Sequence, residues 1–308
     1  MRMNQARDYR RIAVTPAAGA LGAYVECGDL RTLDAETFTE IRQAFADHLV
    51  LFFRGQEMDG GSFETLGERF GELTITYYVA PMEGTRKVQR LVREADAAWG
   101  QRNFGDNWHI DQSVREEPNS IFGLYAVETP PYGGDTMFAN LYLAYETLSP
   151  GMQRLCDPLS VMHSSRGLYG NDGRGGRGYQ KAMDRAAFTL SDEDLRAQLA
   201  KETKHPLVVR HPDTGRKLLY LTGPYCVRFE DMTEDESAPL IDYLYRHCQR
   251  PELTCRLHWE RGTIAIMDNR CLLHFAVQDY AGFRREMYRF EVAGERPAGS
   301  PRSPATNR

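Results

Sequence analysis

Two residues of types that commonly bind metals lie two positions apart in the segment NFGDNWHIDQSV, residues 103–114. The segment is typical of an extended strand, in which side chains at positions i and i+2 point to the same face. His109 and Asp111 could therefore bind one ion together. The pair could also be two polar residues on a solvent-exposed strand, so a metal site needs a third ligand from elsewhere in the chain.

His274 is the candidate for the third ligand. It lies in DNRCLLHFAV, a late β segment that could pair beside the first, whereas the other six histidines lie at junctions, around a hairpin-like segment, on a helix or at a strand start. Two histidines and one carboxylate on one side of an ion leave three positions open, which is the arrangement of non-heme Fe(II) oxygenases. Zinc-dependent hydrolysis is the competing chemistry.

Two arginines follow His274 at +11 and +15, in the segment FRREMYRFEV. Arg285, Met287 and Arg289 share one face if this segment is a strand. Arginines among inward-facing apolar residues are costly unless each meets an anion. The pattern therefore favours two anion sites close to the metal, with an exposed edge strand as the alternative.

The elements that must position these residues alternate between helical and β patterns. Apolar spacing predicts helices over 33–49, where Phe38, Ile41 and Phe45 form one stripe, over 62–71 from Ser62 as N-cap, near 143–155, and over 233–249. Buried β runs are LVLFFRGQ, SIFGLYAVET, TMFANLYL, GTIAIMDNRCLLHFAV and FRREMYRFEV, the second and third joined by a Pro-Tyr-Gly-Gly turn.

These β segments must pair across the helices that separate them. The expected fold is therefore mainly β with helical additions, a β-sandwich or jelly roll, rather than two independent domains. We expect one domain over residues 1–295 with a helical and loop insertion at about 143–205, and a disordered tail over 296–308. The Gly- and Arg-rich stretch 164–180 is expected to be a loop, either a lid over the site or surface disorder.

Composition excludes several classes of partner. The chain has 308 residues, 38 Lys and Arg against 43 Asp and Glu, and a net charge of −5 without a long basic run, which argues against nucleic acid. No apolar run approaches the ~20 residues that span a bilayer. Six scattered cysteines without a CxxC pair indicate reduced thiols and a cytoplasmic protein, for which a homo-oligomer is compatible with the sequence.

At these residues the chain resembles the taurine dioxygenase and 2,4-dichlorophenoxyacetate dioxygenase family of Fe(II)- and 2-oxoglutarate-dependent oxygenases. The resemblance covers roughly residues 10–295 and is strongest in NWHID, VETPPYGGDTMFANLYLAYETLSP, HPLVVRHPDTGRKLLYL and MDNRCLLHFAVQDYAGFRREMYR. The family motif combines H-x-D, a GGDT turn, a histidine in D-N-R-x-x-x-H, and arginines at +11 and +15 from it. Every element is present with that spacing.

The resemblance implies a double-stranded β-helix, or jelly roll, and a role for each matched residue. His109, Asp111 and His274 would hold Fe(II), and 2-oxoglutarate and dioxygen would complete the site. Arg285 and the Thr136 hydroxyl would bind the distal carboxylate of 2-oxoglutarate, and Arg289 would bind an acidic group of the substrate. The implied reaction is hydroxylation of a small anionic organic substrate with release of succinate and CO2.

Departures from the family pattern bear on the substrate. Thr76, Val79 and Gly105 align where the taurine enzymes have a histidine, a tyrosine and an asparagine, so taurine itself is not expected. The smaller lining, with Tyr77 as a further substrate-binding candidate, suits a bulkier aryloxyalkanoate, sulfonate, sulfate or other carboxylate substrate.

Three alternatives stay open from the sequence. Desaturation or oxidative rearrangement would use the same cofactors as hydroxylation. A zinc hydrolase would use the same three ligands, but it leaves Arg285 and Thr136 without a role. A non-catalytic jelly-roll binding protein would need none of the matched residues.

Overall fold

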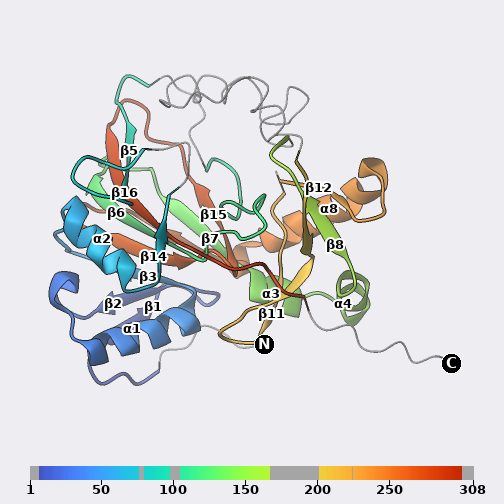
Figure 1. Ribbon diagram of the computed structural model, residues 1–308, viewed down its shortest axis with the longest axis horizontal. Helices are drawn as coiled ribbons and strands as arrows, with labels where there is room; N and C mark the ends of the chain where they lie inside the picture. Colours follow the sequence, from blue (N-terminus) through green and yellow to red (C-terminus); the bar gives the residue numbers. More distant parts are fainter. Residues whose placement is uncertain (1–6, 76–79, 98–104, 167–200, 224, 300–308) are drawn as a thin grey trace.

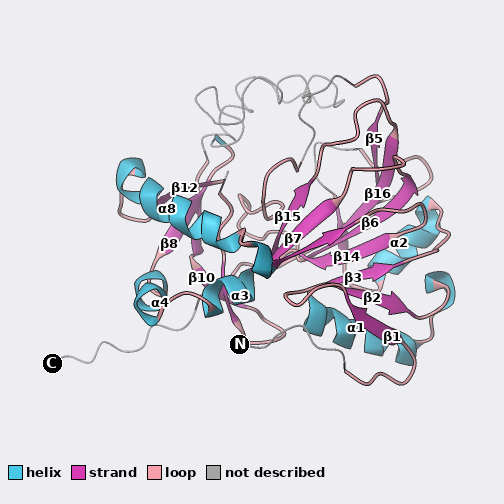
Figure 2. Ribbon diagram, turned by 180° about the vertical axis from the view of Figure 1, so that it is seen from behind, coloured by secondary structure: helices cyan, strands magenta, loops and turns pink. Residues whose placement is uncertain are grey.

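The computed structural model describes residues 7–75, 80–97, 105–166, 201–223 and 225–299 (Figure 1). Strands make up most of its regular structure, and most of its few helices lie toward the outside of the molecule (Figure 2). The expectation of a mainly β chain with helical additions is confirmed. Within the described residues, no helix is both long and apolar enough to cross a membrane.

The bounds of the elements follow. The helices are α1 (Ala35–His48), α2 (Gly60–Glu68), α3 (Leu141–Glu146), α4 (Pro150–Cys156) and α8 (Glu234–Cys248), with short 3-10 helices η1 (Leu30–Thr32) and η2 (Pro251–Leu253). The strands are β1 (Ala13–Pro16), β2 (Ala23–Glu26), β3 (Val50–Phe53), β4 (Leu73–Thr74), β5 (Gln89–Arg93), β6 (Ile121–Glu128), β7 (Thr136–Asn140), β8 (Ser160–His163), β9 (Thr203–Pro206), β10 (Val208–Arg210), β11 (Lys217–Leu219), β12 (Cys226–Phe229), β13 (Thr254–Leu257), β14 (Ile264–Asp268), β15 (Leu272–Ala276) and β16 (Arg285–Val292).

The largest sheet joins the two ends of the chain. Its strands run in the order β1-β2-β3-β14-β6-β16-β4, and β5 also pairs with β16. Only β2 and β3 are parallel among these pairs. Late strands therefore lie between early ones, as the need for distant β segments to pair predicts.

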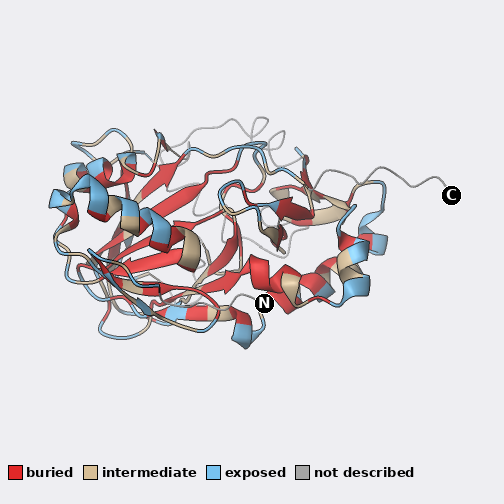
Figure 3. Ribbon diagram, turned by 90° about the horizontal axis from the view of Figure 1, so that it is seen from below, coloured by how far each residue is buried: buried red, intermediate tan, exposed pale blue. Residues whose placement is uncertain are grey.

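Alternation along the central strands divides the core into two layers. Val50 and Phe52 of β3 face the cluster between the sheets, whereas Leu51 and Phe53 face the cluster under α1 and α2. Each of these side chains is 1% exposed or less, and full burial of a side chain of this size contributes about 1.5–3 kcal/mol. The apolar run of β3 is therefore explained by burial on both faces, which Figure 3 shows for the central strands.

A three-stranded sheet, β13-β7-β15, packs against the large one and completes the sandwich. Phe52 of the large sheet and Phe138 of β7 are in contact across the gap, with ring centroids 5.7 Å apart. The runs SIFGLYAVET and TMFANLYL do not form one hairpin, because β6 belongs to the large sheet and β7 to the small one. The GGDT turn thus carries the chain from one layer to the other, and α3 begins at Leu141, within the second run.

Two of the expected helices differ from those of the structure. The second helix begins at Gly60 with Asp59 as N-cap, and Ser62 is its third residue, whose side chain completes a capping box with Asp59. That helix ends at Glu68 rather than at Gly71. The single helix expected near 143–155 is two short ones, α3 and α4, separated at Ser149, which caps α4.

The remaining elements form a second group beside the sandwich. The sheet β12-β8-β9 lies against α8, which begins with the expected capping box of Thr233 and Glu236, and β10 and β11 form the expected hairpin. Residues 298 and 299 of the expected disordered tail are held to it, since the Arg210 amide donates to the Ala298 carbonyl. Residues 300–308, most of the insertion and residues 167–180 of the predicted loop lie outside the described part of the chain.

Candidate metal centre

His109 and His274 come together through their backbones. Each donates its amide to the carbonyl of the other at 3.0 Å, which forms an isolated antiparallel bridge. His274 lies in the middle of β15, as expected, whereas the extended strand expected around His109 is wrong, because the chain turns from Asp111 onward. One bridge and one turn, rather than a strand, place Asp111 beside both rings.

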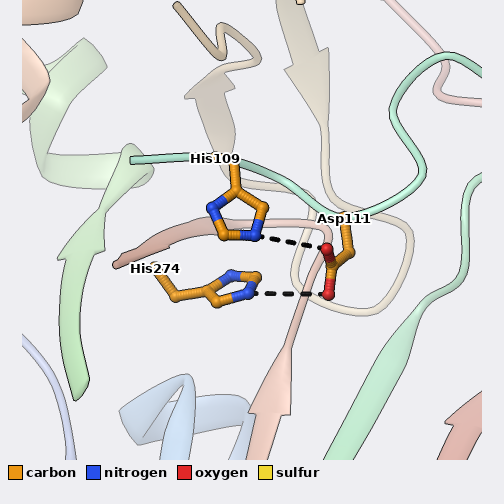
Figure 4. Close-up of side chains that lie close together, drawn as sticks. All are labelled: His109, Asp111 and His274. Atoms are coloured by element: carbon orange, nitrogen blue, oxygen red, sulfur yellow. Dashed lines mark ion pairs between the residues drawn. The ribbon is translucent and has the colours of Figure 1, made fainter. Parts of the chain in front are cut away.

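The ligand atoms of the three residues converge on one point (Figure 4). The Asp111 carboxylate lies 3.3 Å from His109 Nε2 and 3.5 Å from His274 Nε2, and the two rings are 4.1 Å apart between centroids. Two atoms that bind one ion at about 2.1 Å and at right angles are separated by about 3 Å. The spacing therefore fits a single metal with three protein ligands.

Hydrogen bonds and charges around the three residues suit a metal. The His109 ring donates from Nδ1 to the Asn107 carbonyl at 2.7 Å, which leaves Nε2 as the nitrogen that faces Asp111 and the candidate metal position. Burial lowers the pKa of His274 to about 4, so this ring is neutral at pH 7. Burial alone would raise the pKa of Asp111, but the nearby positive charge of Arg289 holds this pKa well below its usual range.

Asn269 fixes the backbone that carries Asp111. Its side-chain oxygen accepts the Asp111 amide at 2.9 Å, and its side-chain nitrogen donates to the Asp111 and Asn119 carbonyls at 2.9 and 2.8 Å. The turn after β14 is thereby tied to the segment of the first two ligands. The D-N-R stretch signalled this residue, although its role as a backbone clamp was not anticipated from the sequence.

A second cluster of the described residues, His211, Asp268 and Cys271, also has ligand-type atoms within 4.8 Å of one another. Its carboxylate is already used, because Asp268 accepts from Arg270 at 2.8 and 2.7 Å and lies 3.0 Å from His211 Nε2. Burial raises the pKa of the Cys271 thiol well above its ordinary value. This cluster is a buried ion-pair network that shapes the turn before β15, and it does not favour a metal.

Arg289 faces the metal centre from β16 and already meets two carboxylates. Its Nη2 lies 3.1 Å from Asp111 Oδ2 and 2.6 Å from Glu291 Oε1, and the guanidinium stacks 4.6 Å from the Phe122 ring. Glu291 is 1% exposed and also accepts from Asn119. The sequence analysis did not identify Glu291 as the counter-charge of Arg289, although Glu291 lies only two residues further along the same strand and on the same face.

Arg285, on the same face of β16, lies in a different electrostatic environment. Its guanidinium lies 5.8 Å from the Trp259 ring and 5.9 Å from the Tyr280 ring, and its buried Nε has no hydrogen-bond partner among the described residues. Burial lowers the pKa of Arg285, and only partial compensation comes from Tyr280 and Asp135. A buried cation without a carboxylate partner is costly, which favours an anionic ligand at this position.

Thr136, the first residue of β7, is 3% exposed. Its Oγ1 accepts a hydrogen bond from the Trp259 indole at 2.9 Å. Since the hydroxyl accepts from the indole, its own hydrogen is directed toward another acceptor. Trp259 thus fixes the orientation of the Thr136 hydroxyl, a contact that the motifs did not indicate.

The four other substrate-binding candidates divide into two groups. Thr76, Tyr77 and Val79 lie outside the described residues. Gly105 lies beside the metal centre, since its carbonyl accepts from the Ala276 amide and a Cβ at this position would lie 3.3 Å from His109 Cε1. Its φ of +87° and this close approach explain why glycine suits the position.

Comparison with known proteins gives one consistent result. The family model described as "Taurine catabolism dioxygenase TauD, TfdA family" matches residues 13–290. The chain is 35% identical to an alpha-ketoglutarate-dependent sulfate ester dioxygenase of Pseudomonas putida over 93% of this chain and 91% of that protein. It is 30% identical to pentalenolactone F synthase of Streptomyces arenae, over 95% and 99% respectively.

A solved structure agrees with these relatives. The crystal structure of a taurine dioxygenase from Burkholderia xenovorans superposes with a TM-score of 0.76 at 30% identity, and the similarity covers 94% of each chain. The jelly-roll fold expected from the resemblance is confirmed by this similarity together with the two-layered β core.

Proposed function

Because this chain belongs to the TauD, TfdA family and is an Fe(II)- and 2-oxoglutarate-dependent dioxygenase, we propose that His109, Asp111 and His274 form its iron site. The observation that carries the proposal is the convergence of two imidazole nitrogens and one carboxylate. A zinc hydrolase and a non-catalytic binding protein, both considered from the sequence, leave the family match unexplained.

Fe(II), when bound, supplies a redox centre at which dioxygen reacts with 2-oxoglutarate, so that succinate and CO2 are released and the substrate is oxidised. The chain's own contribution is to fix geometry. Asn269 holds the Asp111 backbone, the Asn107 carbonyl fixes the tautomer of His109, and the His109–His274 bridge keeps the two rings on one side. An ion held by these three ligands would leave positions open for cosubstrate and dioxygen.

We assign the distal carboxylate of 2-oxoglutarate to Arg285 and Thr136. The buried guanidinium of Arg285 needs an anion, and the Thr136 hydroxyl has a hydrogen to donate because Trp259 occupies its oxygen as an acceptor. A carboxylate that accepts from both groups would satisfy each of them. This arrangement would fix the cosubstrate at the end remote from the metal ligands.

We assign the substrate anion to Arg289. At ~3.3 Å per residue, four positions along β16 place Arg289 about 13 Å from Arg285, so the two arginines can serve different anions. Relatives named for sulfate esters and sulfonates support a small anionic substrate, of the sulfate, sulfonate or carboxylate class. Binding would require the anion to share Arg289 with Glu291.

Metal binding and turnover test the site together. His109→Ala, Asp111→Ala and His274→Ala should each abolish Mn(II) binding in calorimetry and succinate formation with Fe(II), because a facial site that loses one of three ligands holds the ion poorly. Asp235→Ala, on the exposed first turn of α8, is the matched carboxylate control and should retain both. A metal-site variant with normal Mn(II) affinity would exclude this assignment.

A substrate panel then separates the reaction types. If the enzyme hydroxylates, the products together should contain one added oxygen atom, either in one molecule or, where the hydroxylated carbon bears the sulfate, sulfonate or aryloxy group, as a carbonyl compound plus the released sulfate, sulfite or phenol. Loss of two hydrogen atoms in mass spectrometry would indicate desaturation. Sulfate esters, sulfonates and aryloxyalkanoates should be oxidised, and their uncharged analogues should be poor substrates. Equal turnover of charged and uncharged analogues would contradict the assignment of Arg289.

A further inference from the structure

β5 contributes a second inward-facing row of side chains beside the metal centre. In the antiparallel register of β5 and β16, Arg93 lies directly opposite Arg285, Leu91 opposite Met287, and Gln89 opposite Arg289. The buried positions of β5 are Gln89 and Arg93, whereas Arg90 and Val92 are exposed. The face of β16 that carries Arg285 and Arg289 therefore continues onto β5.

Arg93 is a buried cation directly opposite another one. It is 8% exposed, its Nη1 donates to the Gln278 side-chain oxygen at 2.8 Å, and its guanidinium lies 4.7 Å from the Tyr280 ring. Neither Arg93 nor Arg285 forms an ion pair with a carboxylate of the described residues, and both pack on Tyr280, which is 2% exposed. Like charges directly opposite on neighbouring strands destabilise a sheet unless something compensates them.

The inward face that β5 and β16 share has a different charge balance at its two ends. At the Arg289 end, Asp111 and Glu291 supply two carboxylates for one guanidinium. At the Arg285 end, two guanidiniums both pack on Tyr280, and Asp135, whose charge acts on Arg285, is already bound to Arg256 and His258. The uncompensated positive charge thus lies where the distal carboxylate is placed above.

We propose that Arg93 is a second cation for that carboxylate, so that Arg93 and Arg285 hold the distal carboxylate of 2-oxoglutarate between them. Directly opposite residues of an antiparallel pair have Cβ atoms about 4.5–5.5 Å apart, close enough for two guanidiniums to donate to one carboxylate. The ligand of Arg93 cannot be the substrate anion, because that anion is assigned to Arg289, four residues further along β16 than Arg285. The inference rests on the proposed role of Arg285.

Discrimination between two keto acids tests the role of Arg93. Calorimetry on the Mn(II)-loaded protein would measure the Kd of 2-oxoglutarate and of 2-oxobutyrate, which lacks the distal carboxylate. In Arg93→Gln the Kd of 2-oxoglutarate should rise at least tenfold, while that of 2-oxobutyrate should change less than twofold. Arg90→Gln is the matched control, because it removes an arginine from the exposed face of the same strand, and it should change neither Kd.

Several outcomes would overturn the inference. A 2-oxoglutarate Kd within twofold of the wild-type value, or equal weakening of both keto acids, would show that Arg93 supports the sheet or another ligand. If Arg93→Gln does not fold, Arg93→Lys keeps the charge without the guanidinium fork and should selectively weaken 2-oxoglutarate by a smaller factor; unchanged selectivity there overturns it too. Arg285→Gln, measured in parallel, separates a failure of this inference from a failure of the proposed cosubstrate site. If Arg285→Gln weakens the binding of 2-oxoglutarate and Arg93→Gln does not, only the role of Arg93 is wrong. If neither variant changes the Kd of 2-oxoglutarate, the proposed cosubstrate site is wrong.

Discussion

Glu291→Gln should strengthen the binding of anions at Arg289, even though it removes a stabilising ion pair. Glu291 Oε1 lies 2.6 Å from Arg289 Nη2, and the carboxylate is 1% exposed. An incoming anion therefore competes with a carboxylate that is already in place. Glutamine keeps the shape and one acceptor oxygen but removes the competing charge.

The size of the effect follows from the charge separation. Two unit charges about 4 Å apart interact by about 4 kcal/mol at an effective dielectric constant of about 20. A tenfold change in Kd requires about 1.4 kcal/mol, roughly a third of that value. We therefore expect the Kd of an anion at Arg289 to fall at least tenfold. Stability should fall by about 1.5–3 kcal/mol, the contribution of a hydrogen bond to a charged group.

The assay uses methyl sulfate as a simple anion. Calorimetry on protein loaded with Mn(II) and N-oxalylglycine would measure its Kd, and urea unfolding would measure the free energy of unfolding. Glu286→Gln is the matched control, because Glu286 lies on the opposite face of β16 and pairs with Arg90 and Arg284. An unchanged or weaker affinity in folded Glu291→Gln protein would refute the placement of the anion at Arg289.

Three further predictions concern the cosubstrate pocket, pH and packing. Trp259→Phe should raise the Kd of 2-oxoglutarate about fivefold in calorimetry, since the lost 2.9 Å hydrogen bond to Thr136 is worth about 1 kcal/mol; an unchanged Kd would remove Trp259 from the positioning role. Burial holds the pKa of His163 well below its usual value, so the unfolded chain binds the extra proton first and stability should fall as the pH drops below about 6.5, by up to about 1.4 kcal/mol per pH unit. Urea unfolding at a series of pH values should show a shallower decline in His163→Gln, and an identical slope would contradict this cause. Gly123→Ala should lower the free energy of unfolding by about 1–3 kcal/mol or more, because its Cβ would overlap the Phe290 ring, and a variant of unchanged stability in urea would show that the ring can move.

Local pattern was sufficient for the parts of the fold that depend on burial. The apolar run of β3 is visible in the sequence because both faces of that strand are buried against apolar clusters, and the face of β16 that carries Arg285, Met287 and Arg289 is visible from its two-residue period. The N-cap of α2 was misplaced because Asp59 and Ser62 can each cap a helix, and each in fact bonds the other's backbone.

Contacts between distant segments were harder to anticipate. The convergence of His109, Asp111 and His274 could be predicted from residue type and spacing, but the strand expected at His109 is a single bridge, since pairing there depends on β15 rather than on local propensity. The positions of Arg93 and Asn269 depend on register between strands and on a turn about 160 residues from Asp111, which no local pattern encodes.

The bridge between His109 and His274 also determines when the site can exist during synthesis. The two histidines are separated by more than half of the chain, and β14, β15 and β16 all come from its last fifth. A nascent chain that ends before these strands has β3 and β6 without the central partner that separates them, and the first two proposed ligands have no third. Iron at the proposed site would therefore have to bind after His274 has been synthesised, because a shorter chain bears only His109 and Asp111.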